Sequence, residues 1–156
     1  MGTAGLEIAV ENPDRPDVVV LIEELNTYLL SLYKPDQCHH LTIRELAGDA
    51  VTFLTARIDG ELVGCGALRR IDKRMSEVKR MYVLPSLQGR GIGRQLLDAI
   101  EALALEQGTG TLVLETGVEQ PDAVALYEKS GFTQRGAYLD YAEDGISIFM
   151  EKRIAT

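Results

Sequence analysis

The chain has 156 residues, 46% of them hydrophobic and 26% charged, which is typical of a single globular domain with a sizeable core over residues 1–156. Its formal net charge of −8 disfavours nucleic acid as a partner, because binding to phosphates requires a basic face, and favours cationic ligands such as amines. No apolar run is long enough to span a bilayer and no secretory signal pattern is present, so we expect a cytoplasmic protein with no membrane partner.

The first third of the chain predicts a strand and then two helices. Residues 6–10 (LEIAV) suit a strand. Asp17 is a candidate N-cap for a helix over residues 18–32, in which apolar side chains recur at intervals of three and four positions. A short helix is expected over residues 41–46.

The next segment predicts a hairpin and a further strand. Asp59 and Gly60 lie between two β-rich runs, and this pair favours a type I′ turn, in which both central residues have positive φ. Residues 77–83 (EVKRMYV) predict the strand that follows, and Pro85 ends it.

Helices and strands alternate in the second half of the chain. We expect a helix over residues 89–107, a buried strand over the apolar run 111–116, and a helix that begins near Pro121. Residues 132–133 and 146–154 predict two last strands. The resulting order predicts an α/β fold of the α+β kind, with helices packed on a mixed sheet.

The two cysteines, Cys38 and Cys65, are expected to be reduced thiols, because no secretory signal accompanies them. Cys65 lies between two glycines in an apolar run, which predicts that it is buried. Residues 38–40 (CHH) offer metal-ligating atoms, but adjacent residues lack the spaced pairs of a zinc site. We therefore expect a polar loop there and no metal site.

The stretch QGRGIG, residues 88–93, directly follows a strand and opens a helix. The first backbone N–H groups of a helix lack partners within it, and the helix dipole adds partial positive charge. Gly89 and Gly91 keep side chains away from these donors, and Arg90 and Arg94 add positive charge. These features predict a phosphate or pyrophosphate site whose spacing fits neither common nucleotide-binding pattern. Alternatively, the glycines only allow tight packing of the helix on the sheet.

The run from Val78 to Leu97 resembles the acetyl-CoA motif of the GNAT family of N-acetyltransferases. The hallmark of that family, Gln/Arg-x-x-Gly-x-Gly/Ala, is matched by Gln88, Gly91 and Gly93. A second block of the family, a helix ending in tyrosine before Gly-Phe, is matched by residues 123–132 (AVALYEKSGF). The resemblance implies a mostly antiparallel mixed sheet that is splayed in the middle, with helices on both faces, and acetyl-CoA as co-substrate.

The resemblance also implies where acetyl-CoA binds. The backbone of Met81, Tyr82 and Val83 would pair with the pantetheine arm, so that the sheet must open between Val83 and the strand that begins near Thr111. The thioester would lie in that gap. The coenzyme A pyrophosphate would be held by the backbone amides of the loop and first turn, namely Gln88, Gly89, Arg90, Gly91, Ile92, Gly93 and Arg94.

The expected reaction is attack of a neutral amine on the thioester carbonyl. An alkylamine has a pKa of about 10.4 and is mostly protonated at pH 7, so a group must accept its proton, directly or through water. Glu77 is the candidate general base, because strand alternation places it on the same face as Met81 and Val83 and related enzymes often carry a glutamate here. Alternatively, Glu77 only forms a salt bridge with a neighbour such as Lys79.

Tyr127 matches the family tyrosine that hydrogen-bonds the thioester sulfur and acts as general acid toward the leaving thiolate. Its ring also suits packing on the inner face of a helix, and the two roles are compatible, since tyrosine has an apolar ring and a polar tip. Tyr33 and Tyr141 lie in segments that often line the acceptor pocket of related enzymes, but neither is assigned a substrate role.

These observations predict an acetyl-CoA-dependent N-acetyltransferase that acts on a primary amine of a small molecule or an amino acid, or on a protein amine. One alternative is a non-catalytic acyl-CoA-binding module, and another is an acyltransferase for longer acyl-CoA. The apolar C-terminal strand, residues 146–154, is expected to present an edge that permits a homodimer.

Overall fold

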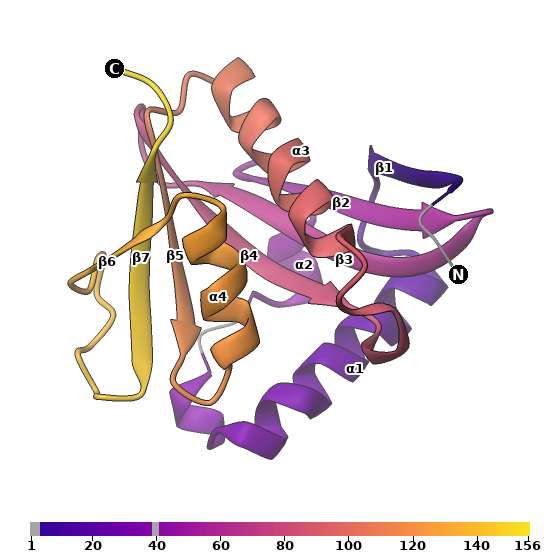
Figure 1. The fold of residues 1–156 in the computed structure, drawn as a ribbon, viewed down its shortest axis with the longest axis horizontal. Helices are drawn as coiled ribbons and strands as arrows, with labels where there is room; N and C mark the ends of the chain where they lie inside the picture. The colour runs from indigo at the N-terminus through magenta and orange to yellow at the C-terminus, as the bar shows by residue number, and fades with distance from the viewer. Residues whose placement is uncertain (1–3, 39–40) are drawn as a thin grey trace.

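All strands in the described part of the chain belong to one seven-stranded sheet with the order β1-β2-β3-β4-β5-β7-β6 (Figure 1). The structure is a computed structural model that describes residues 4–38 and 41–156. β4 and β5 are parallel, and every other neighbouring pair is antiparallel, which confirms the predicted mixed sheet. The strands are β1 (Leu6–Val10), β2 (Val51–Ile58), β3 (Glu61–Arg70), β4 (Met75–Val83), β5 (Thr111–Gly117), β6 (Thr133–Arg135) and β7 (Ser147–Arg153).

Helices cover both faces of this sheet (Figure 1). α3 (Ile92–Glu106) and α4 (Pro121–Lys129) lie in front of it in this view, and α1 (Pro16–Leu32) and α2 (Ile43–Leu46) lie behind. The order of the elements is the predicted one, with two short 3₁₀ turns added at Pro35–Gln37 and Pro85–Leu87.

The start of α1 differs from the prediction. The N-cap is Arg15 and not Asp17, because Pro16 takes the first helical position, where its missing N–H costs nothing. Asp17 lies in the first turn instead. The predicted hairpin turn is confirmed, with φ of 51° at Asp59 and 84° at Gly60.

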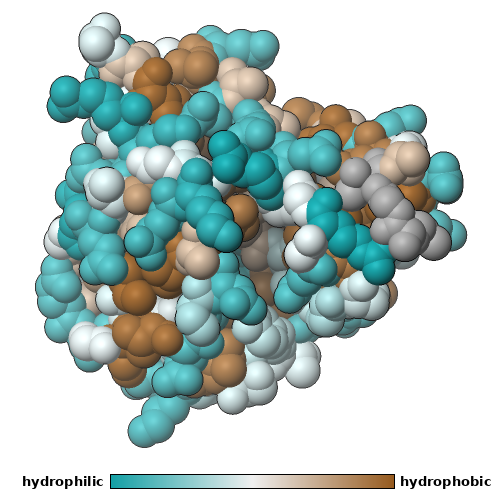
Figure 2. Space-filling view, viewed as in Figure 1, coloured by the Kyte–Doolittle hydropathy of each residue, from teal (hydrophilic) through white to brown (hydrophobic). Residues whose placement is uncertain are grey.

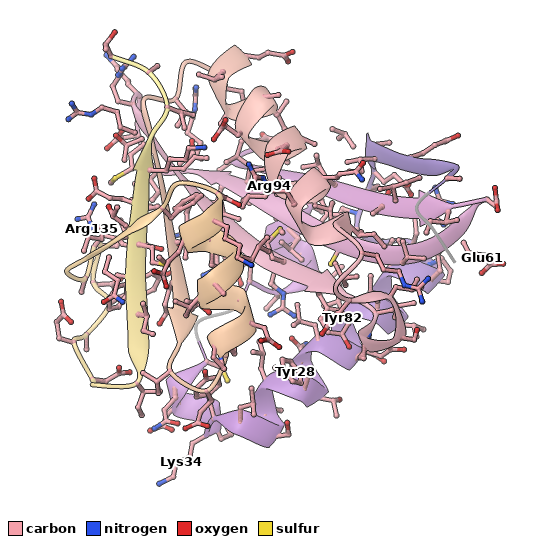
Figure 3. All side chains as sticks on the ribbon, viewed as in Figure 1. Tyr28, Lys34, Glu61, Tyr82, Arg94 and Arg135 are labelled. Carbon is pink, nitrogen blue, oxygen red and sulfur yellow. The ribbon has the colours of Figure 1, made fainter. Side chains whose placement is uncertain are left out.

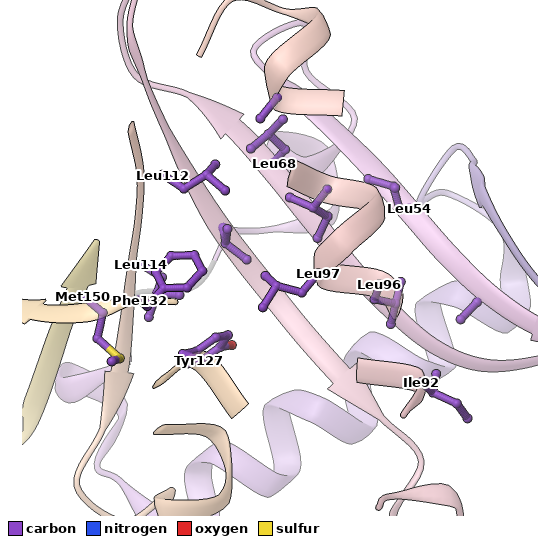
Figure 4. Close-up of a cluster of buried hydrophobic side chains, with 14 of the residues drawn as sticks. Leu54, Leu68, Ile92, Leu96, Leu97, Leu112, Leu114, Tyr127, Phe132 and Met150 are labelled. Carbon is purple, nitrogen blue, oxygen red and sulfur yellow. The ribbon is translucent and has the colours of Figure 1, made fainter. Parts of the chain in front are cut away.

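Two apolar layers form, one on each face of the sheet. The front layer joins α3 and α4 to the sheet through side chains such as Leu96, Leu112 and Leu114, all at most 1% exposed (Figure 4). The rear layer joins α1 and α2 to Phe53 and Cys65. Cys65 is 0% exposed, as predicted, and both cysteines are free thiols.

The sheet opens between β4 and β5. The two strands pair only from Met75 opposite Thr111 to Val78 opposite Leu114. Further along, Tyr82 and Val83 pair with β3 alone, so their other backbone edge faces the opening. The splay implied by the family resemblance is therefore present, and it lies where the predicted pantetheine-binding residues end β4.

A β-bulge at Arg80 changes which side chains share a face of β4. Arg80 has a φ of 56°, and the pairing register of β3 and β4 shifts beside it. Met81 and Val83 consequently pack in the front layer with Val78, whereas Tyr82 packs in the rear layer. The predicted alternation, with Glu77 on the face of Met81 and Val83, is wrong because the extra residue reverses the side chains after it.

The C-terminal strand is not an open edge along its centre. β7 pairs with β5 on one side, and Phe149, Met150 and Glu151 pair with β6 on the other. The expectation that this strand offers its edge to a second subunit is therefore wrong over residues 149–151, because the short β6 covers them.

Within residues 4–38 and 41–156, no helix is long and apolar enough to cross a membrane. The same residues contain no group of three or more histidine, cysteine or carboxylate side chains that could hold a metal ion. His39 and His40, part of the CHH stretch, lie outside the described residues.

Arg57 of β2 joins α1 to the segment between β1 and α1, and it supplies a test of the fold. Its guanidinium contacts Glu11 at 2.9 Å and Asp17 at 2.8 Å, and these hydrogen bonds hold the pKa of both carboxyls below their usual range. Replacing Arg57 with methionine should lower the free energy of unfolding at pH 7 by about 1.5–3 kcal/mol, the range for hydrogen bonds to charged groups. Urea unfolding of both proteins measures the difference.

The sign of the pH dependence follows from the lowered pKa of Glu11 and Asp17. Their stabilising contribution is present above the ordinary carboxyl pKa of about 4 and is lost as the pH falls through the lower folded-state values. The difference between wild type and Arg57→Met should therefore shrink toward pH 3. An undiminished difference at that pH would show that Arg57 stabilises the fold through packing and not through its charge.

Candidate active site

A cavity lies where β4 and β5 separate, and elements from both faces of the sheet line it. In the space-filling view the surface is hollowed near the middle, between the part that carries α4 and the part that carries α3 (Figure 2). The lining includes apolar residues of α1, the bulged segment of β4, the end of β5, and single residues of α4 and β7. Its polar and reactive members include Tyr33, Cys38, Lys79, Arg80, Glu115, Gln120, Tyr127 and Ser147.

Tyr127 reaches the cavity from α4 while its ring belongs to the front apolar layer. The ring packs edge-on against Phe132, with 5.8 Å between the ring centroids, and its hydroxyl points away from β7 (Figure 4). Burial raises the pKa of Tyr127, so the phenol keeps its proton at neutral pH. Tyr127 therefore both packs in the apolar layer and lines the cavity, where its protonated hydroxyl could donate a hydrogen bond.

Glu77 does not line the cavity, although the sequence makes it the candidate base. Its side chain is 0% exposed, and one carboxylate oxygen lies 2.8 Å from Nη2 of Arg69. The other oxygen accepts hydrogen bonds from Tyr138 and, at 3.2 Å, from Tyr141. This enclosure argues against direct contact between Glu77 and an acceptor amine. The surroundings of Glu77 fit the alternative interpretation, in which it forms a salt bridge.

Lys79 connects this buried group to the cavity. Its ammonium nitrogen lies 3.8 Å from Glu77 Oε2 and donates to the Tyr141 hydroxyl at 3.1 Å, while the residue lines the cavity wall. Burial is the largest influence on Lys79 and lowers its pKa, and the neighbouring carboxylates oppose that change. Glu77 therefore supports a cation at the cavity.

Glu115 is a carboxylate of the cavity that the sequence reasoning missed. It follows the last β4–β5 pair, Val78 with Leu114, so it lies where the strands begin to diverge. Ser147 Oγ donates to Glu115 Oε2 at 2.6 Å. The sequence does contain a signal for this residue, because Glu115 is the single charged residue in the apolar run 111–116.

The glycine loop contains glycines of two kinds. Gly89 and Gly91 have φ of 81° and 85°, and a Cβ atom on either would meet no other atom within 4 Å. A Cβ on Gly93 would instead lie 3.2 Å from Cδ2 of Leu126 on α4. Gly93 thus fits the alternative in which a glycine allows tight packing of the helix. Gly89 and Gly91 instead set the backbone conformation and leave open space beside it.

The other loop residues divide between the surface and the core. Arg90 is exposed, and Ile92 is buried at 1% exposure. Arg94, between α3 and α4 in Figure 3, lies 3.2 Å from Asp98 Oδ1 and donates to the carbonyl of Lys129 at 3.4 Å. Gln88 donates from its side chain to the Val83 carbonyl at 3.0 Å. The backbone at the start of α3 therefore remains the best candidate for anion binding.

Comparisons with known proteins agree with this geometry. A model of the acetyltransferase (GNAT) family matches residues 19–132 of the chain. The IAA acetyltransferase of Azospirillum brasilense is 48% identical over 147 residues, which cover 93% of this chain and 95% of that protein.

Solved structures extend the likeness to almost the whole chain. A Klebsiella pneumoniae protein assigned to the acyl-CoA N-acyltransferases is 35% identical, with a TM-score of 0.81 over 96% of this chain and 98% of that one. A GNAT family acetyltransferase from Elizabethkingia anophelis, with acetyl-CoA bound, shares the fold at 22% identity and a TM-score of 0.68, over 96% of this chain and 99% of that one. The chain therefore belongs to the GNAT family and is an N-acetyltransferase with acetyl-CoA as co-substrate.

Proposed function

We propose that the protein transfers the acetyl group of acetyl-CoA directly to a primary amine of a small molecule or an amino acid. The observation that supports this most is the cavity at the splay, which is lined by a protonated phenol from one face of the sheet and by a carboxylate at the strand divergence. Direct transfer needs a proton donor near the leaving sulfur and a proton acceptor near the attacking amine. Most of the rate gain comes from holding the amine and the thioester together.

In this proposal acetyl-CoA enters along the end of β4. The loop and first turn of α3, residues 88–94, bind the pyrophosphate with backbone amides, and the backbone edge of Met81 to Val83 that faces the opening pairs with the pantetheine arm. Tyr127 then lies beside the thioester sulfur and donates a proton to the leaving thiolate. The side chain of Ile92 stays in the core and contributes only its backbone.

The proton of the attacking amine is accepted by Glu115, directly or through water. We assign this role to Glu115 and not to Glu77, because Glu115 lines the cavity whereas Glu77 is enclosed by four side chains. Glu77 is a positioning residue in this proposal: it keeps Lys79 charged at the cavity wall.

Release of free coenzyme A thiol tests the reaction. Purified protein is incubated with acetyl-CoA and a panel of amino acids, alkylamines, a lysine peptide and IAA, the last because of the name of the 48% identical relative. We expect thiol release above the hydrolysis background with one acceptor class and an N-acetylated product by mass spectrometry. Binding of acetyl-CoA without product from any amine would contradict the proposed acceptor class.

The assignment of the base leads to a separate prediction. Glu115→Gln should lower kcat/KM for the amine by about 100-fold at pH 7, within the range for general base catalysis, and leave the KM for acetyl-CoA unchanged. The exposed Glu119→Gln, just beyond β5 and outside the cavity lining, is the matched control and should behave as wild type.

Glu77→Gln separates the two candidate bases. It removes the carboxylate that supports Lys79, so we expect a lower free energy of unfolding and a smaller loss of activity than in Glu115→Gln. The opposite result, full activity in Glu115→Gln and a loss of about 100-fold in folded Glu77→Gln, would return the role of general base to Glu77.

A further inference from the structure

Arg80 is a buried cation at the cavity whose charge no described carboxylate balances. The residue is 6% exposed and lines the cavity from the bulge of β4. Its Nη2 donates to the side-chain oxygen of Asn26 on α1, a neutral group, and its Nε has no hydrogen-bond partner among the described residues. None of the described carboxylates forms an ion pair with it.

This arrangement is costly and is imposed by the backbone. A non-glycine residue with a φ of 56° is strained, and burying a charge without a counter-charge is also unfavourable. Burial lowers the pKa of Arg80 to about 10, so the guanidinium is still charged at pH 7. A strained, charged and buried residue beside a cavity indicates a ligand that supplies the missing negative charge.

The opposite wall of the same cavity carries the complementary charge. Glu115 lines it from β5, while Lys79, held by Glu77 and Tyr141, lies next to Arg80 on β4. A ligand between these walls meets cations on one side and a carboxylate on the other. The positive wall is notable in a chain with a net charge of −8.

We propose that Arg80 binds a carboxylate of the acceptor, which makes the acceptor an amino acid or another small amine that carries a carboxylate. This inference rests on the proposed function, in which the amine of the acceptor is the nucleophile and Glu115 takes its proton. A guanidinium suits this task because its planar donors match both oxygens of a carboxylate. The anion at Arg80 is distinct from the coenzyme pyrophosphate, since residues 88–94 do not line the cavity.

Matched acceptors test the proposal. The wild-type protein is assayed with each amino acid, the corresponding amino acid amide and the corresponding aminophosphonate at saturating acetyl-CoA. We expect kcat/KM for the free acid to exceed that for the amide by about 10- to 100-fold, the factor expected for hydrogen bonds to a charged group. A preference for the phosphonate over the carboxylate would overturn the choice of a carboxylate.

Variants of Arg80 assign the preference to this residue. Arg80→Gln should lower kcat/KM for the acid to the level of the amide and leave the KM for acetyl-CoA unchanged, and Arg80→Lys should retain part of the preference. Arg44→Gln, an exposed arginine on α2 outside the cavity lining, is the control and should keep it. Equal losses on acid and amide in Arg80→Gln would overturn the proposal.

The thermal midpoint, Tm, distinguishes a binding role from a structural one. Removal of an uncompensated buried charge should leave the Tm of Arg80→Gln equal to or above that of wild type. A clearly lower Tm with an unchanged acid preference would show that Arg80 serves the fold and would overturn the proposal.

A direct binding experiment keeps this test independent of the proposed reaction. If no amine in the panel releases thiol, N-acetylated amino acids are titrated into the coenzyme A-bound protein by isothermal calorimetry. Saturable binding that Arg80→Gln abolishes supports the carboxylate site even when the proposed function has failed. No binding to wild type overturns the site.

Discussion

Tyr127→Phe is expected to lower kcat by about 100-fold and to leave the fold and the KM for acetyl-CoA nearly unchanged. The phenol is the proposed proton donor and lines the cavity at the splay, and the substitution removes its hydroxyl without changing the ring that packs against Phe132. Its hydroxyl makes no hydrogen bond to another described residue, so the Tm should not fall. Steady-state thiol release and thermal unfolding of the two proteins check both expectations.

Tyr28→Phe is the matched control for this prediction. Tyr28 is 42% exposed on α1, lies outside the cavity lining, and loses the same single oxygen. It should behave as wild type. An unchanged kcat in Tyr127→Phe, measured in single turnovers so that product release does not mask chemistry, would contradict the role of Tyr127 as general acid.

The pH dependence of kcat gives a second expectation for Tyr127. Its raised pKa keeps the phenol protonated beyond the ordinary tyrosine value of about 10, so its deprotonation should not limit the rate at or below that pH. A loss of kcat in wild type below pH 10 that is absent in Tyr127→Phe would contradict the raised pKa.

The order of elements could be predicted because each has a local signal. The Asp59-Gly60 pair, the apolar spacing of α1 and α3, and Pro121 at the start of α4 all depend on neighbours a few residues away. The largest error in a helix boundary occurs where the backbone adopts a special conformation. α3 begins at Ile92 and not at residue 89, because Gly89 and Gly91 have positive φ.

The faces of β4 could not be predicted, because the bulge has no comparable signal. Arg80 adopts a positive φ although its residue type does not favour one, and its side chain then lies beside α1. The strand pattern showed residues 77–83 as regular, which placed Glu77, Met81 and Val83 on one face. The structure separates these residues, and Arg80 lines the cavity instead.

The exposure of the two glutamates depends on contacts between distant segments. Glu77 is enclosed by Tyr138 and Tyr141, more than 60 positions later in the chain, whereas Glu115 lines the cavity because β4 leaves β5 beside it. Neither fact follows from spacing within one strand. The sequence resemblance led to the proposed coenzyme side of the site, whereas the proposed acceptor side depends on the packing of the sheet.

The two sides of the site meet because the sheet is splayed. α4 brings Tyr127 from the front face (Figures 1 and 4), and α1, the bulge and β5 contribute the polar residues of the proposed acceptor wall. Tyr28 of α1 packs near Tyr82 at the end of β4, with 6.4 Å between ring centroids, which keeps α1 against this strand. In the proposed reaction, acetyl-CoA and the acceptor would therefore approach the cavity from different sides of the sheet.

Changing Gly91 should have the largest effect on acetyl-CoA binding. Gly91 is the N-cap of α3, and a side chain there would enter the open space beside the first backbone amides. We expect Gly91→Asn to raise the KM for acetyl-CoA about 10-fold, because even asparagine, which tolerates positive φ, occupies that space. Gly91→Asp should raise it by a further factor of about 100, since one charge within 4 Å of a phosphate is worth several kcal/mol at an effective dielectric constant near 20.

Gly108→Asn separates binding from backbone strain. Gly108 lies just beyond the other end of α3 and has the same φ of 85° and the same open surroundings as Gly91. It lies outside residues 88–94, which are proposed to bind the pyrophosphate. Both asparagine variants should therefore lose similar stability, while only Gly91→Asn weakens acetyl-CoA, as measured by KM and by calorimetric titration. Equal acetyl-CoA affinity in the two variants would mean that Gly91 serves the turn alone, and that the pyrophosphate binds elsewhere.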